Sequence, residues 1–173
     1  MNRFLSEESI TKHSDYVRQK RLKYSIIESS VSSIKGAKIS DLYCMKINSR
    51  DRRDAIDLLS EITLHDVFFS SFKAPPYSRS NLVASAYGNE ANFLNHIYRT
   101  CLFLPHGFVL VYLTGDRIEV RECTDFACAC RHSSPTLAID VCEHAYFSDY
   151  GFDKEKYLLS ALPYLDLTEL TVT

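Results

Sequence analysis

Apolar residues recur at helical spacing in the first half of the chain. Residues 6–33 are predicted to form one helix, which Ser6 can cap, with apolar positions at Ile10, Val17, Leu22 and Ile26. A second helix is predicted over residues 53–72, with Ile56, Leu59, Ile62 and Phe69 near one face. The pair Pro75-Pro76 stops this second helix, because proline cannot continue the hydrogen-bonded ladder. The two helices are expected to form an antiparallel hairpin.

Helical and strand patterns alternate in the second half. Residues 80–104 predict one or two helices interrupted near Gly88. The apolar run GFVLVYL (107–113) and the alternating run RIEVREC (117–123) flank a turn and predict a β-hairpin. Residues 124–134 are expected to be a loop, TLAID (136–140) a third strand, and KEKYLLSALPYL a helix that continues until Pro163.

The order of these elements predicts an α+β fold. An N-terminal α-helical hairpin lobe, residues 1–76, is followed by a C-terminal α/β lobe, residues 77–173, which holds a three-stranded antiparallel sheet. The length of 173 residues is enough for one domain with a real core, or for two small lobes sharing an interface.

Charge and composition narrow the function classes. The formal net charge of -2 gives no reason to expect nucleic acid or an anionic membrane as a partner. No apolar run approaches the roughly 20 residues that cross a bilayer. The N-terminus has no apolar signal-peptide core, so a cytoplasmic location is expected.

The six cysteines form no CxxC pair, which argues against a zinc ribbon. We expect reduced, mostly buried thiols. Cys128 and Cys130 form a lone CxC whose role the sequence leaves open. The chain has 11 Tyr and 10 Phe but no Trp.

The strongest local chemical signal is the pair Asp140 and His144. An apolar strand delivers the aspartate at its end, and the histidine follows four residues later. A carboxylate and an imidazole this close can share one cation, and these donors suit manganese, iron or zinc better than copper(I). By itself the spacing is weak, because a surface aspartate beside an unrelated histidine would look the same.

The surrounding residues resemble a known family. DVCEHAYFSDY (140–150) is similar to the Asp-x-Trp-Glu-His-Ala-Tyr signature of iron/manganese superoxide dismutases, with Cys142 in place of the tryptophan. GFVLVYL and SAYGNEANF (85–93) resemble further segments of that family, and the similarity extends from about Leu5 to Leu165. It implies dismutation of superoxide to dioxygen and hydrogen peroxide at one iron or manganese ion per subunit. By comparison with the family, the extended arm that usually precedes the first helix is expected to be missing.

The resemblance implies four metal ligands and a solvent molecule: His13, His65, Asp140 and His144. His65 lies in LHDVFF and His13 ends LSEESITKH, both as the family places its histidines. A second register would align His13, Tyr16 and Val17 with a later His-x-x-Tyr-Val of the family. The first register is preferred because it also matches five residues upstream of His13.

Two departures from the family concern residues around the metal. Arg21 occupies the position of the tyrosine that gates the substrate funnel. It would attract the superoxide anion there, or it is a solvated basic residue. Glu61 occupies the position of the iron-type glutamine that bonds solvent at the metal, whereas the manganese-type position falls on Thr124 or Asp125. The sequence therefore leaves iron or manganese open, and an ionised Glu61 would favour the oxidised metal.

Other departures concern the interface and the lining of the site. A hydrogen bond that crosses the family's dimer interface has lost both partners, which are Val17 and Phe147 here. Glu143 keeps its place beside His144, so a homodimer through these two residues is expected. The positions of the family's tryptophans hold smaller residues: Phe69, Phe108, Leu110 and Cys142.

Two functional hypotheses follow from these observations. The complete ligand set favours an active dismutase, whereas the altered surroundings favour a non-catalytic relative that binds metal or a partner. A metal-dependent enzyme of another class, with Glu61 as its base, is a third reading.

Overall fold

The computed structural model describes residues 4–73, 80–131 and 133–171. Its helices are α1 (Glu7–Ser30), α2 (Ile39–Cys44), α3 (Ser49–Ser70), α4 (Asn81–Tyr87), α5 (Glu90–Phe103), α6 (Phe126–Ala129), α7 (Glu143–Tyr150) and α8 (Lys154–Ala161). Its strands are β1 (Phe108–Thr114), β2 (Arg117–Cys123) and β3 (Leu137–Asp140). Three 3-10 turns complete the described elements: η1 (Ser32–Ile34), η2 (Leu162–Tyr164) and η3 (Leu167–Glu169).

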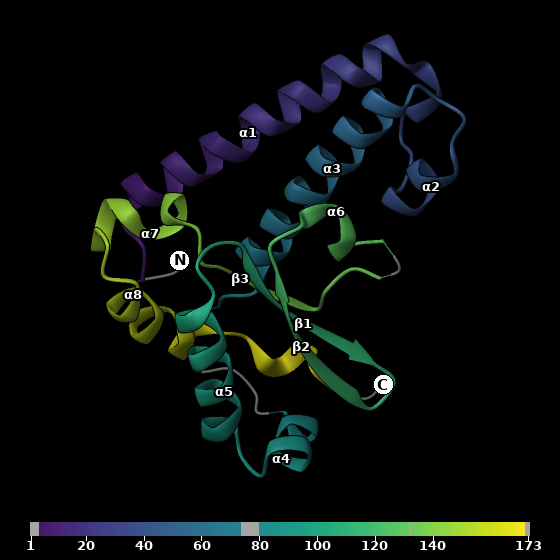
Figure 1. Ribbon diagram of the computed structural model, residues 1–173. Coiled ribbons are helices and arrows are strands. Elements are labelled where there is room, and N and C mark those ends of the chain that lie inside the picture. Colours follow the sequence, from purple (N-terminus) through teal and green to yellow (C-terminus); the bar gives the residue numbers. More distant parts are fainter. Residues whose placement is uncertain (1–3, 74–79, 132, 172–173) are drawn as a thin grey trace.

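The helical hairpin predicted from the first half is present. Helices α1 and α3 run antiparallel, side by side (Figure 1). The Ser6 hydroxyl accepts a hydrogen bond from the Ser9 N–H, and the Asn48 side chain caps α3 in the same way. The distal end of the hairpin is closed by a small apolar cluster: Ile34, Leu42, Ala55 and Ile56.

The predicted apolar face of the first helix is only partly correct. Val17 is buried, but Leu22 and Ile26 are 51% and 65% exposed. A helix turns about 100° per residue, so the nine residues from Val17 to Ile26 place the two side chains on opposite sides of α1. A single apolar face could not include both.

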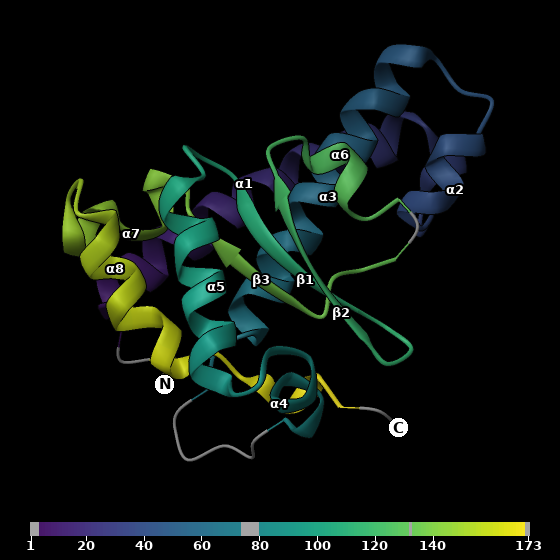
Figure 2. The same cartoon turned by 60° about the horizontal axis from the view of Figure 1, so that its bottom comes forward.

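The three strands form one antiparallel sheet in the order β2-β1-β3, which confirms the predicted α+β class. Helix α3 packs against β3 and α5 packs against β1. In both views the sheet lies between the helical hairpin and the pair α4 and α5 (Figures 1 and 2). Strand β3 is buried along its whole length. In the register, Asp140 at its end lies opposite Phe108 of the central strand.

Three short helices were not predicted. Helix α2 follows Gly36, α6 lies within residues 124–134, which were expected to be a loop, and α7 follows the third strand. Each has too few residues for a helical period to be visible in the sequence. Helix α2 is fixed by tertiary packing instead, since Ile39 and Leu42 are buried.

The predicted lobe boundary between residues 76 and 77 and the pair Pro75-Pro76 lie outside the described residues. On either side of that gap, Phe72 and Leu165 form an antiparallel bridge. Buried residues from both halves also share one hydrophobic core. Among the described helices, none is both long enough and apolar enough to cross a membrane.

The expectation that the cysteines are mostly buried is confirmed for the side chains that the structure describes. Four of these thiols are buried, whereas Cys44 is exposed. The side chain of Cys128 lies outside the described residues.

Candidate metal centre

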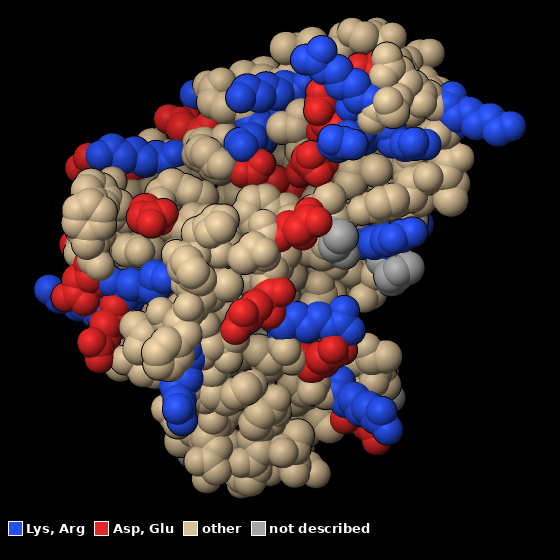
Figure 3. Space-filling model, in the orientation of Figure 1, with Lys and Arg blue, Asp and Glu red and all other residues tan. Residues whose placement is uncertain are grey.

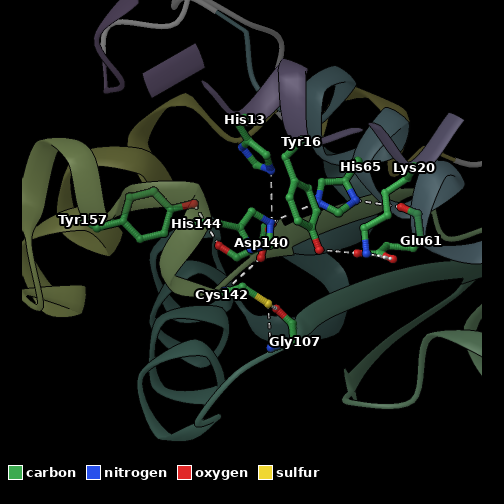
Figure 4. A network of polar contacts seen from close by, with 10 residues as sticks. All are labelled: His13, Tyr16, Lys20, Glu61, His65, Gly107, Asp140, Cys142, His144 and Tyr157. Carbon is green, nitrogen blue, oxygen red and sulfur yellow. Dashed lines mark hydrogen bonds and ion pairs between the residues drawn. The ribbon is translucent and has the colours of Figure 1, made fainter. Parts of the chain in front are cut away.

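Four elements that are distant in sequence bring their side chains together at one point. His13 comes from the first turns of α1 and His65 from the C-terminal half of α3. Asp140 is the last residue of β3, and His144 lies in the first turn of α7. One potential ligand atom from each of the four lies within 4.8 Å of the others (Figure 4). The four residues that the sequence singled out as ligands therefore form one cluster.

The imidazole nitrogens surround a single carboxylate oxygen. The Nε2 atoms of His13, His65 and His144 lie 3.2, 3.5 and 3.1 Å from Asp140 Oδ2. A cation held about 2.1 Å from each ligand would separate neighbouring ligand atoms by about 3.0–3.6 Å. The three separations from Asp140 Oδ2 fit one ion.

The hydrogen bonding of the buried atoms also fits a cation. Among the described residues, His13 Nε2 and Asp140 Oδ2 are buried side-chain atoms that make no hydrogen bond of good geometry, although they lie 3.2 Å apart. Leaving such groups unpaired in a protein interior costs about 1–3 kcal/mol each, and more when they are charged. A metal ion bound between them would satisfy both atoms.

Hydrogen bonds from neighbouring groups orient His65 and Asp140, two of the candidate ligands. His65 Nδ1 lies 2.7 Å from the Glu61 carbonyl oxygen, to which it donates when protonated, and this leaves Nε2 for a metal. The Cys142 N–H donates to Asp140 Oδ1 at 2.8 Å, which leaves Oδ2 directed at the histidines. The Tyr157 hydroxyl donates to the Asp140 carbonyl and fixes the end of β3 (Figure 4).

The protonation states of two ligands are those that a metal needs. Burial lowers the pKa of His65 and outweighs the attraction of Asp140, so the ring is neutral at neutral pH. Burial by itself would raise the pKa of Asp140, but the neighbouring His13 and His144 hold it below its ordinary value. A neutral imidazole and a carboxylate are the metal-binding forms of these groups.

Aromatic rings form much of the wall of the site. The Phe68 and Phe69 rings lie 5.1 and 5.0 Å from the His13 ring, and the Phe108 ring lies 5.2 Å from the His65 ring. Phe69 and Phe108 thus line the ligands as expected for residues in place of tryptophan. Cys142 instead accepts a hydrogen bond from the Gly107 N–H through its sulfur, and Leu110 is buried in the sheet.

Tyr16 is a residue of the site that sequence reasoning considered only in the rejected register. Its ring stacks on the His144 ring at 4.3 Å, and its hydroxyl donates to Glu61 Oε1 at 2.6 Å. Burial and then the Glu61 bond raise the pKa of Tyr16 to about 12. The signal was available in the sequence, since residues three apart share a face of a helix, and Tyr16 follows His13 by three.

Glu61 and Arg21 have different surroundings. Glu61 is 7% exposed, and its carboxylate also pairs with Lys20 Nζ at 2.8 Å. Arg21 Nη2 donates to both oxygens of Asp66, at 2.5 and 2.7 Å, and both side chains are about half exposed. Asp66 therefore partners the positive charge that was predicted to attract superoxide.

Over the helical hairpin, acidic and basic side chains lie side by side, whereas the surface over α4 is mostly uncharged (Figure 3). Further ion pairs on α1 and α3 join Arg18 to Asp15 and Arg50 to Asp54. The cations in these pairs are largely neutralised locally, so they add little long-range attraction for an anion.

One comparison with known proteins agrees with the C-terminal part of this geometry. Residues 78–171, just over half of the chain, match the family model for iron/manganese superoxide dismutases, C-terminal domain. Asp140 and His144 lie inside the matched segment, whereas His13 and His65 lie before it. A search of curated proteins returned no match.

Proposed function

Because the chain belongs to the iron/manganese superoxide dismutase family, we propose that it dismutates superoxide to dioxygen and hydrogen peroxide at one mononuclear iron or manganese ion. His13, His65, Asp140 and His144 would hold that ion. The observation that carries the proposal is the convergence of three imidazole Nε2 atoms on Asp140 Oδ2. The bound metal would supply the redox chemistry by alternating between its +3 and +2 states, and the protein would supply ligands, protons and a tuned potential.

The protein groups beside the ligands have a role in proton delivery. Formation of one hydrogen peroxide and one dioxygen from two superoxide anions consumes two protons. Tyr16 Oη holds a proton beside His144, and its raised pKa of about 12 keeps that proton in place at neutral pH. In this proposal Tyr16, one helical turn after His13, serves where the family has its gate tyrosine, and Arg21 does not.

The first test is the rate of superoxide consumption per bound metal, measured on protein loaded separately with iron and with manganese. We expect a second-order rate constant close to the diffusional ceiling of about 10⁸–10⁹ M⁻¹s⁻¹ with at least one metal. A loaded protein that is no faster than the free metal ion would refute the activity. Comparison of the two metals would also decide which ion the site uses.

A metal-binding protein without turnover is the alternative function. It is favoured by the ion pair of Arg21 with Asp66, because this position carries the gate tyrosine in the family. Stoichiometric metal binding without superoxide consumption would establish the alternative.

We further propose a homodimer in which Glu143 bonds His144 of the partner subunit. Phe147 and Phe152, just beyond these residues, are 47% and 84% exposed, and their rings lie 5.0 Å apart. Exposed aromatic pairs are typical of surfaces that a partner covers.

Glu143→Ala is expected to convert the dimer to monomers, measured by light scattering over a range of protein concentrations. Glu122→Ala, which removes an exposed glutamate from β2, is the matched control and should leave the mass unchanged. A wild-type chain that is monomeric throughout would contradict the proposed dimer.

A further inference from the structure

A lysine lies beside the carboxylate that replaces the family's glutamine. Lys20 Nζ is 2.8 Å from Glu61 Oε2, while the Tyr16 hydroxyl donates to the other oxygen, Oε1 (Figure 4). The ammonium also lies 4.8 Å from the centre of the Tyr16 ring, within the range of a cation–π contact. The side chains of Lys20 and Glu61, taken without their backbone atoms, are 22% and 10% exposed, so water screens this pair only partly.

Helix geometry explains why Lys20, and not Arg21, reaches Glu61. Seven residues of an α-helix fall about 20° short of two turns, so Lys20 lies almost directly along the helix from His13. Arg21, one residue further, is rotated by about 80° from His13, and it pairs with Asp66. The face of α1 that carries His13 therefore also carries Tyr16 and Lys20.

We propose that Lys20 is a positioning residue that offsets the charge of Glu61, so that the pair takes the place of a neutral hydrogen-bonding side chain beside the metal. This inference rests on the proposed metal centre and deepens it. A lone carboxylate near the ligands would stabilise the oxidised ion more than the reduced one and would lower its potential. A cation 2.8 Å from the carboxylate cancels most of that effect at the metal, because the two charges form a compact dipole.

A short series of contacts connects the Lys20–Glu61 pair to two of the proposed ligands, His144 and His65. The Glu61 carboxylate accepts from Tyr16, which stacks on His144, and the Glu61 carbonyl accepts from His65. On its other side the pair faces a cavity of about 470 Å³ between α1 and α3, lined also by Lys23, Asp54 and Asp57. Lys20 lines this cavity and is not one of the four proposed ligands, so it can be substituted while the ligand set is kept.

The test is a double-mutant cycle read out as the midpoint potential of the bound iron, by redox titration of the loaded protein. Lys20→Met should shift the potential to more negative values, because Glu61 is left uncompensated. Glu61→Gln should shift it to more positive values, because Lys20 is left uncompensated. The double variant K20M/E61Q should return close to the wild-type potential. Lys20→Arg keeps the charge and should stay closer to wild type than Lys20→Met.

Lys23→Met is the matched control, since it removes a lysine from the same cavity one turn further along α1. The inference is overturned if Lys20→Met shifts the potential no more than Lys23→Met does. It is also overturned if the double variant shows no return toward wild type. Should Lys20→Met fail to fold, Glu61→Gln and the double variant still decide the question, because compensation requires opposite deviations in potential.

The outcomes separate this inference from the proposed activity. Opposite shifts in a protein that does not consume superoxide would support the charge pair and refute the dismutase. Unchanged potentials in an active enzyme would refute the charge pair and support the dismutase. A chain that binds neither iron nor manganese would overturn both.

Discussion

Asp140→Asn is expected to abolish stable metal binding. Asp140 Oδ2 is the atom on which the three histidines converge, and the carboxylate is the only negative charge among the four proposed ligands. The substitution keeps the size of the side chain and an Oδ1 that can accept from the Cys142 N–H. It removes the charge that attracts the cation. Loss of an outer hydrogen-bond partner already costs a site about 10–100-fold in affinity, so loss of this ligand should exceed about 100-fold.

The measurement is metal per chain after loading with iron or manganese and exhaustive dialysis. Asp116→Asn makes the same chemical change in the exposed turn between β1 and β2 and serves as the control. Circular dichroism of both variants would establish that they fold alike. Equal metal retention by the two variants would mean that the cluster is not the metal site.

The cluster of four candidate ligands was predictable from sequence because each residue lies in a recognisable context. Asp140 and His144 lie in a run that resembles a family signature. His65 lies on the second helix, in the place where the family has its second histidine. His13 was open to two registers, and its position beside Asp140 supports the preferred one. The alignment that predicted His13 as a ligand also directed attention to Arg21 as the counterpart of a tyrosine.

The residues around the ligands were harder to predict, because their roles depend on rotation about the helix axis. Tyr16 and Lys20 follow His13 by three and seven residues, which places all three on one face of α1. A motif comparison treats each position separately and does not show that a hydroxyl can be supplied from another turn of the same helix. The expected electrostatic effect of the Glu61 carboxylate likewise changes once Lys20 is found beside it.

The fold shows the same limit at short elements. Strand β1 is recognisable as a continuous apolar run, β2 as an alternating one, and the long helices have enough residues for a helical pattern to appear in the sequence. Helices α2 and α6 do not, and their structure depends on contacts with α3 that no local pattern records.

Gly107→Ala is expected to cause the largest loss of stability among single methyl additions at glycine. Gly107 precedes β1 and has a backbone φ of +115°, which residues other than glycine rarely adopt. A Cβ at this position would lie 2.2 Å from the Cys123 carbonyl oxygen, a backbone atom that cannot rotate away. The strained φ costs about 1–3 kcal/mol and the overlap another 1–3, so the free energy of unfolding should fall by about 2–6 kcal/mol.

Gly107→Ala should also reduce metal binding at the proposed metal centre. Gly107 accepts a hydrogen bond from the Val141 N–H and donates one to the Cys142 sulfur, and these two residues directly follow Asp140. Gly115→Ala is the matched control. It has a φ of +61° and no atom within 4 Å of the added Cβ, so only the left-handed backbone costs about 1–2 kcal/mol. Urea unfolding and metal content should both separate the two variants. If Gly107→Ala were no less stable than Gly115→Ala, the close approach of Gly107 to the Cys123 carbonyl would not constrain this position.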